Sequence, residues 1–256
     1  MKAVILAGGM GTRLGEETRV RPKPMVEVGD MPILWHIMKI YSHYGINEFV
    51  ILLGYKGHMI KEFFANYFLH QADLTFNLAD NSMEVHKVAS EPWKVTLLET
   101  GLENMTGSRL LQAREYLSDQ SFCLTYGDGV SDVNMKDLLE FHSSHGKLVT
   151  ITSVQPEGRF GALNMDSDNQ VLHFAEKPKG DGKWINAGFM VMEPGIFDYL
   201  EARKDLILER EPLEKIASAG QMKAYRHYGF WKCMDTLSDK NSLEKLWKAG
   251  GPWKVW

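Results

Sequence analysis

The chain has 256 residues, of which 44% are hydrophobic, and its formal net charge is −4 at pH 7. These values fit one large α/β domain, or one domain with a small appendage. The charge is spread without a basic block, so the composition gives no sign of a nucleic-acid or anionic-lipid surface. The N-terminal apolar run is shorter than that of a secretory signal, and no stretch approaches the ~20 apolar residues of a membrane span. The two cysteines, Cys123 and Cys233, are too few for a disulfide framework or a zinc site, so we expect a cytoplasmic protein.

Short apolar runs predict strands, and 3.6-residue periodicity between them predicts helices. In chain order, strands are expected at 2–7, 48–53, 74–78, 95–98, 122–126, 149–154, 171–175 and 189–192. Helices are expected within 32–45, 56–68, 134–146 and 236–250. Strand and helix alternate up to residue 148, which predicts an α/β fold with a mainly parallel sheet and helices on both faces. Residues 149–235 are richer in strand and predict an antiparallel extension of the sheet or a lid subdomain.

A glycine-rich loop, LAGGMGTRL, follows the first predicted strand directly. Gly8, Gly9 and Gly11 let the backbone turn sharply, and a run of free N–H groups of this kind forms an anion-binding concavity. A dinucleotide fingerprint would need glycine in place of Leu14, and a Walker A loop would need Gly-Lys-Ser/Thr. The loop therefore indicates a different phosphate site, with a plain strand-to-loop turn as the alternative.

Two cations accompany the loop. Arg13 lies within it, and its planar guanidinium suits phosphate oxygens. Lys23 lies in RPKPM, where Pro22 and Pro24 stiffen the backbone around it. The pair indicates fixed positive charge against a phosphate, with solvated surface cations as the alternative.

Two aspartates, Asp128 in TYGDG and Asp235 in GFWKCMDT, follow apolar runs. Carboxylates at strand ends suit Mg²⁺, which takes a few protein oxygens and leaves room for phosphate oxygens. Taken singly, Asp128 also fits a turn residue and Asp235 also fits a helix N-cap. If residues 231–235 are extended, Trp231, Cys233 and Asp235 share one face, so Trp231 would line the pocket. Cys233 would then make the protein sensitive to thiol reagents, unless it is simply a small buried hydrophobe.

The segment GGMGTRL followed by PKP resembles the sugar-1-phosphate nucleotidyltransferase family. Further segments that run in order along nearly the whole chain, GYKGHMIKEFFANYF, EPWKVTLLETG and GFWKCMDTL among them, look like the branch of that family that joins CTP to glucose 1-phosphate. One departure is Ser108, because that branch commonly has a second glycine in its TGGRL segment. If this backbone approaches the nucleotide, Ser108 would alter the fit.

The resemblance implies a Mg²⁺-dependent enzyme with a Rossmann-like domain over residues 1–256, divided into a nucleotide-binding part (1–148), a sugar-binding part (149–235) and a C-terminal helix and tail (236–256). It implies catalytic roles for Arg13, Lys23 and Asp128, and metal ligation by Asp128 and Asp235. The implied nucleotide-binding residues are Leu6, Ala7, Gly8, Gly9, Met10, Gly11, Thr12, Arg13, Lys23, Thr106, Gly107, Arg109 and Asp128. The expected sugar-phosphate residues are Gly161, Glu176, Lys177, Asn186, Gly188 and Trp231.

Three alternatives remain at this stage: a thymidylyl- or uridylyltransferase for glucose 1-phosphate, a regulatory protein that binds the ligands without catalysis, and a Rossmann dehydrogenase. The last is disfavoured by Leu14. We also expect a homo-oligomer, since closed symmetric assembly is the norm for such enzymes. Trp253 and Trp256 at the C-terminus are expected to dock on a neighbouring subunit.

Overall fold

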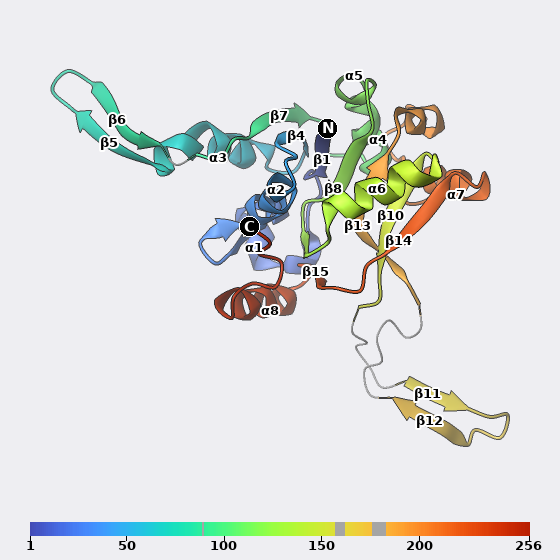
Figure 1. Cartoon of the computed structure of the whole chain (residues 1–256). Helices are drawn as coiled ribbons and strands as arrows, with labels where there is room; N and C mark the ends of the chain where they lie inside the picture. The colour runs from blue at the N-terminus through green and yellow to red at the C-terminus, as the bar shows by residue number, and fades with distance from the viewer. Residues whose placement is uncertain (89, 157–161, 176–182) are drawn as a thin grey trace.

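The computed structural model describes residues 1–88, 90–156, 162–175 and 183–256. A seven-stranded sheet in the order β14-β10-β13-β8-β1-β4-β7 runs through its centre (Figure 1). The strands are β1 (Lys2–Leu6), β4 (Glu48–Leu53), β7 (Lys94–Glu99), β8 (Phe122–Tyr126), β10 (Val149–Val154), β13 (Ile185–Met192) and β14 (Met222–Arg226). Only β13 is antiparallel to its neighbours β8 and β10. The prediction of an α/β fold with a mainly parallel sheet is confirmed.

Apolar side chains fill both faces of this sheet, which explains why its strands read as continuous hydrophobic runs. In β1, Ala3 and Ile5 belong to one buried cluster while Val4 and Leu6 belong to another, because successive side chains of a strand point to opposite faces. Helices cover both faces. The first face carries α2 (Ile33–His43), α3 (Gly57–His70), α6 (Met135–His145) and α8 (Leu237–Lys248), and the second carries α4 (Thr106–Gln112), α5 (Arg114–Leu117) and α7 (Glu211–Ser218).

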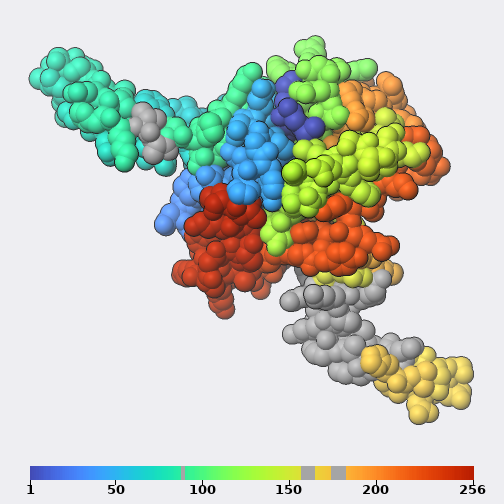
Figure 2. Space-filling view, viewed as in Figure 1, coloured from blue at the N-terminus to red at the C-terminus, as the bar shows by residue number. Residues whose placement is uncertain are grey.

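The apolar run at 74–78 forms a strand but lies outside the central sheet. It belongs to β5 (Ala72–Asn77), which pairs antiparallel with β6 (Ser82–Val88) in a hairpin that stands clear of the body of the molecule (Figures 1 and 2). Asn81, with φ 56°, turns the chain between the two strands. Alternating residues show that a strand forms, but they do not show which strand it pairs with, and here the nearest partner in sequence is the one it meets.

Several short elements do not follow from the periodicity, because two to eight residues give too little pattern. They are the strands β2 (Glu27–Val28), β3 (Met31–Pro32), β9 (Gly129–Ser131), β11 (Ala162–Met165) and β15 (Trp231–Cys233), the α-helices α1 (Glu16–Val20), α4, α5 and α7, and the 3₁₀ turns η1 (Thr12–Leu14), η2 (Lys23–Met25) and η4 (Pro194–Tyr199). β11 pairs with β12 (Val171–Ala175) in a second hairpin. None of the helices in the described ranges is both long and apolar enough to cross a membrane.

The C-terminal tail packs on its own chain. Thr236 caps α8 in a reciprocal capping box with Asp239, so the helix begins where the sequence predicts. Beyond it, Trp253 is fully buried and stacks on Trp247 at 5.8 Å between ring centroids. Trp256 packs edge-on against Trp35 of α2. The expectation of docking on a neighbouring subunit is therefore wrong for Trp253, which is fully buried within its own chain, and stays a prediction for Trp256, which is only partly buried.

Candidate active site

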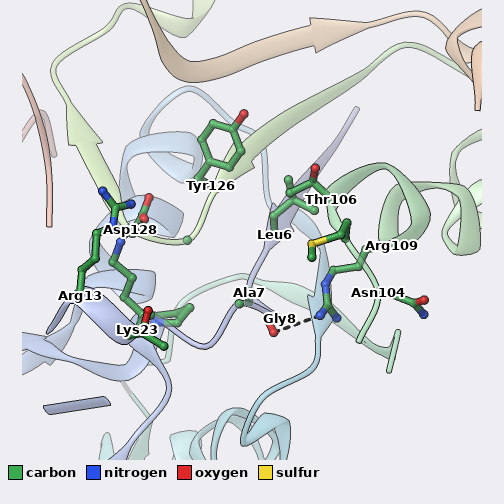
Figure 3. Close-up of a pocket in the computed structure, with 16 residues that line it drawn as sticks. Leu6, Ala7, Gly8, Arg13, Lys23, Asn104, Thr106, Arg109, Tyr126 and Asp128 are labelled. Carbon is green, nitrogen blue, oxygen red and sulfur yellow. Dashed lines mark hydrogen bonds and ion pairs between the residues drawn. The ribbon is translucent and has the colours of Figure 1, made fainter. Parts of the chain in front are cut away.

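A cavity of about 330 Å³ lies beyond the carboxyl ends of β1 and β8; we call it the larger cavity. In Figure 3, Arg13, Lys23 and Asp128 gather on one side of it, and Thr106, Arg109 and Asn104 lie on the other, with Ala7 and Gly8 between them. It is lined by Leu6, Ala7, Gly8, Gly9, Gly11, Thr12, Arg13, Lys23, Pro24, Asn104, Met105, Thr106, Arg109, Tyr126, Gly127 and Asp128. Ligand sites of open α/β sheets lie at this end of the strands.

The glycine loop passes directly from β1 along the floor of the larger cavity. Gly11 has φ 62°, a left-handed conformation that only glycine adopts freely, and it precedes the turn η1 that carries Arg13. Any side chain at Gly8 would overlap the guanidinium of Arg109. These two glycines therefore meet specific demands, a left-handed turn and a close approach.

Arg109 lies behind the floor of the larger cavity rather than free within it. It is 4% exposed, and its Nη1 donates to the carbonyl oxygens of Leu53 and Gly101 and to the hydroxyl of Thr100. Its Nη2 donates to the carbonyl oxygen of Gly8 at 3.1 Å, the bond drawn in Figure 3. Burial lowers the pKa of Arg109, against an opposing effect of Glu99. By these hydrogen bonds, Arg109 links the glycine loop at Gly8 to the end of β4 at Leu53.

Lys23 lies between two carboxylates from distant parts of the chain. Its Nζ is 2.5 Å from Oδ2 of Asp128 and 2.7 Å from Oδ1 of Asp235. Burial works against the positive charge of Lys23, but the two aspartates outweigh it, so the pKa of Lys23 is raised. Arg13 also reaches Oδ1 of Asp235, at 3.0 Å. Burial opposes the negative charge of Asp235, but Lys23 and Arg13 prevail, and the pKa of that carboxyl is lowered.

The same geometry tests whether the two aspartates fit a divalent cation. Two carboxylate oxygens that both lie within hydrogen-bond distance of one nitrogen converge on one point, which is what a shared cation requires. Across the described residues, no group of three or more His, Cys, Asp or Glu side chains forms a metal cage. Two carboxylates with the remaining positions open to water and phosphate oxygens is the arrangement that suits Mg²⁺. Asp235 does not cap α8, because Thr236 does.

A smaller cavity of about 230 Å³ adjoins the larger one and shares Arg13, Tyr126 and Asp128 with it. Its other lining residues are Thr125, Gly129, Asn186, Ala187, Trp231, Cys233 and Asp235. Trp231, Cys233 and Asp235 thus face one cavity, as strand alternation predicts. The indole Nε1 of Trp231 donates to the carbonyl oxygen of Ala187 at 2.7 Å and fixes the ring on that wall.

Cys233 lies beside Asp235, with Sγ 3.7 Å from Oδ2. Burial, together with Asp235 and Asp128, raises the pKa of the Cys233 thiol to about 11. A thiolate is the reactive form of cysteine. At neutral pH this side chain therefore behaves as a small packed group, which speaks against sensitivity to thiol reagents.

A few predicted site residues lie elsewhere. Met10 is half exposed and does not line the larger cavity. Gly107 is buried under Leu206, where an added Cβ would come within 2.8 Å of Leu206 Cγ. Ser108 is also buried in α4 away from the lining, so its difference from glycine does not reach the cavity. Gly161, Glu176 and Lys177 lie outside the described residues. Gly188, with φ 80°, packs under the ring of Tyr126.

Sequence reasoning missed Tyr126, which lines both cavities. A signal existed, because Tyr126 is the last residue of a strand that ends at Gly127 and Asp128, where side chains meet the ligand edge of the sheet. Asn104 and Met105, just before α4, and Pro24, beside Lys23, also line the larger cavity. Their neighbours in the sequence were singled out, but the side chains themselves carry no chemistry that separates them from ordinary loop residues.

Comparison with known proteins agrees with this geometry. The profile of the family described as nucleotidyl transferase matches residues 2–239. The chain is 55% identical to the glucose-1-phosphate cytidylyltransferase of Salmonella typhi and 45% identical to the probable glucose-1-phosphate cytidylyltransferase of Bacillus subtilis, with 100% of both chains covered in each case. The crystal structure of HddC from Yersinia pseudotuberculosis superposes with a TM-score of 0.70 at 23% identity, over 96% of this chain and 99% of that one, and so shares the fold. The chain belongs to the nucleotidyl transferase family, and it is an enzyme of that family.

Proposed function

We propose that this protein transfers a cytidylyl group from CTP to α-D-glucose 1-phosphate, giving CDP-glucose and pyrophosphate. The observation that carries the proposal is the set of Lys23, Asp128 and Asp235 brought together beside the glycine loop. The choice of cytosine as the base and glucose as the sugar rests on relatives that match along their whole length and are named for this reaction. Nucleotidyltransferases of this family generally use a divalent metal, and we propose that it is Mg²⁺.

The larger cavity is the proposed nucleotide site and the smaller cavity the proposed sugar-phosphate site. They meet at Arg13, Tyr126 and Asp128, so the reacting phosphates would lie at this junction. Gly8, Gly9 and Gly11 would offer backbone N–H groups to the triphosphate. Asn186 and Trp231 would lie against the sugar, and Gly161, Glu176 and Lys177 remain proposed sugar-phosphate residues by family resemblance.

The reaction needs little covalent help from the protein. An oxygen of the sugar phosphate, already an anion at pH 7, attacks the α-phosphorus of CTP in line, and the bond between that phosphorus and the bridging oxygen of pyrophosphate breaks. Catalysis of this kind is mostly positioning and charge stabilisation. Lys23 would stabilise the charge that builds on the α-phosphate, and Arg13 would hold the leaving phosphates. Mg²⁺ held by Asp128 and Asp235 would neutralise phosphate charge.

The test is pyrophosphate release with glucose 1-phosphate and Mg²⁺, with CTP, dTTP, UTP, ATP and GTP supplied separately. We expect fast release with CTP and a CDP-glucose product by mass spectrometry. Release with dTTP or UTP instead would still support a nucleotidyltransferase but would overturn the assignment of CTP as the nucleotide. No release with any nucleotide or sugar phosphate, together with measurable binding of CTP, would favour a regulatory binding protein.

We further propose that the protein acts as a homo-oligomer in the cytoplasm. Support for assembly is the β5–β6 hairpin, which stands clear of the body and carries Phe76 and Leu78, 58% and 85% exposed. A two-stranded hairpin alone in water is marginally stable. Light scattering coupled to size exclusion would measure the subunit number, and a monomer at micromolar concentration would contradict the proposal.

A further inference from the structure

Glu209 lies outside both cavities but contacts the wall of each. Its Oε2 accepts a hydrogen bond from the hydroxyl of Thr106 at 2.6 Å, and its Oε1 accepts one from the hydroxyl of Tyr126 at 2.6 Å. Thr106 lines the larger cavity, and Tyr126 lines both. The two side chains come from different elements, the start of α4 and the end of β8 (Figure 3). One carboxylate therefore connects the wall of the larger cavity, the proposed nucleotide site, to the wall of the smaller cavity, the proposed sugar-phosphate site.

The bond from Thr106 runs from its hydroxyl to Glu209, because a carboxylate oxygen accepts. The hydroxyl oxygen of Thr106 accepts a hydrogen bond from the N–H of Leu208 at 2.9 Å, so its own proton is available to Glu209. The N–H groups of Gly107 and Ser108 donate to the carbonyl oxygen of Leu206, which ties the same segment to the first turn of α4. Thr106 is thus held as a donor toward Glu209.

The direction of the bond from Tyr126 follows from its other neighbours. Nδ2 of Asn186 approaches the phenol oxygen at 3.4 Å as a donor, and Oδ1 of Asn186 is occupied by the N–H of Gly188 at 2.8 Å, which fixes the orientation of the amide. The phenol O–H donates to Oε1 of Glu209 at 2.6 Å, because a carboxylate oxygen can only accept. With that proton committed to Glu209, the oxygen of Tyr126 has only acceptor capacity left for a ligand.

We propose that Glu209 is a positioning residue that holds Tyr126 as a hydrogen-bond acceptor for one hydroxyl of the sugar. The inference rests on the proposed function and adds the polarity of one sugar contact to it. Glu209 acts through Tyr126 and touches neither substrate. A site built to accept a hydrogen bond discriminates against an analogue that cannot donate one, because its own polar group is then left unpaired.

A Gln at position 209 reverses this polarity. With the amide oxygen of the Gln facing Thr106, the hydroxyl of Thr106 keeps both of its hydrogen bonds, the one it accepts from Leu208 and the one it donates to residue 209, and the NH₂ of the Gln faces Tyr126. The phenol then accepts from this amide, and its proton turns toward the smaller cavity. The Glu209→Gln change thus converts the phenol from an acceptor into a donor without removing any side-chain atom from either cavity.

The experiment compares kcat/KM for glucose 1-phosphate and its 2-, 3-, 4- and 6-deoxyfluoro analogues, in which fluorine cannot donate a hydrogen bond. The enzymes are the wild type, Tyr126→Phe, Glu209→Gln and the control Glu211→Gln, whose carboxylate forms an ion pair with Lys215 outside both cavities. In the wild type and the control we expect one analogue to lose about tenfold or more relative to glucose 1-phosphate. In Tyr126→Phe and Glu209→Gln that position-specific loss should shrink to within about twofold.

The outcomes separate this inference from the proposed function. A wild type that makes no CDP-glucose would overturn both. An active wild type whose fluorine profile is unchanged in the two variants would overturn the role of Glu209 alone, since a purely structural role lowers kcat/KM for all five sugars by one factor. If Glu209→Gln does not fold, as judged by thermal unfolding, Tyr126→Phe carries the same comparison.

Discussion

Lys23 Nζ lies 2.5 Å from Oδ2 of Asp128, although 105 residues separate the two in the chain. The contact joins the proline-flanked turn η2 to the loop after β8, and Asp235 completes it from the loop before α8. In the substrate complex, a phosphate would compete with the two aspartates for Lys23, and a metal ion would compete with Lys23 for the two aspartates. The two aspartates therefore hold the ammonium group of Lys23 beside the proposed phosphate site before substrate binds.

Replacement of Lys23 by Ala should lower kcat for pyrophosphate release by about 10²–10³, since loss of one preorganised donor to a developing charge typically costs that much. Steady-state rates with CTP and glucose 1-phosphate would measure the effect. The control is Lys94→Ala, which removes an exposed lysine paired with Glu48. Wild-type turnover in Lys23→Ala would remove this residue from the mechanism.

Replacement of Asp235 by Asn should raise the Mg²⁺ concentration that gives half-maximal rate by roughly tenfold or more, because a carboxylate is a far better ligand of Mg²⁺ than an amide. Excess EDTA should abolish the wild-type rate, and added Mg²⁺ should restore it. Asp119→Asn, at a 66% exposed side chain, serves as control. Undiminished turnover in EDTA would exclude a metal at this pair.

Replacement of Arg109 by Lys should destabilise the fold by about 2–4 kcal/mol, because the buried carbonyl oxygens of Leu53, Gly101 and Gly8 would lose donors that a single ammonium cannot replace. KM for CTP should rise as the glycine loop loses its anchor. Urea unfolding and initial-rate kinetics would measure the two effects. The same change at the exposed Arg114 should leave both unchanged, and equal behaviour of the two variants would contradict the anchoring role.

His36 should make stability fall below neutral pH. Burial lowers its pKa to about 4 from an ordinary 6.5, partly offset by the carbonyl oxygen of Val28. Between these values the unfolded chain binds a proton that the folded chain does not, so stability is lost as pH falls from 6.5 to about 4, by about 3 kcal/mol in full.

Urea unfolding from pH 7.5 to 4.5 would show the effect of His36 as the difference between the wild type and His36→Gln. Carboxylates titrate in both proteins and cancel in that difference. His86→Gln, on the β5–β6 hairpin, should follow the wild type. Parallel stability curves for the wild type and His36→Gln would refute the role of His36.

Six of the seven strands of the central sheet could be predicted from sequence, because they carry apolar runs, whereas β14 at the edge of the sheet is partly exposed and was missed. The runs at 48–53, 122–126 and 149–154 have the bounds of β4, β8 and β10. The glycine loop and Lys23 could also be recognised in the sequence, because glycine and proline constrain the local backbone in known ways. The partner of β5 could not, since alternation reports exposure and not pairing.

No local sequence pattern identifies Glu209 as a site residue. Glu209 contacts Tyr126 across 83 residues and Thr106 across 103, and a lone acidic residue before a helix is common in any sequence. Contacts of this kind depend on how two distant elements are laid together. They become visible only when the side chains are placed in space.

The reversed direction of β13 has a consequence for how this enzyme can diversify. Because β10 leaves the sheet at the carboxyl edge of the parallel strands and β13 re-enters at that edge, with Val154 opposite Ile185, the segment between them starts and finishes beside the smaller cavity. Insertions or exchanges there would change the surroundings of the smaller cavity, the proposed sugar-phosphate site, while the hydrogen-bonded strands keep their order. The length of the connection between β10 and β13 can therefore change without altering the strand order that brings Lys23, Asp128 and Asp235 together.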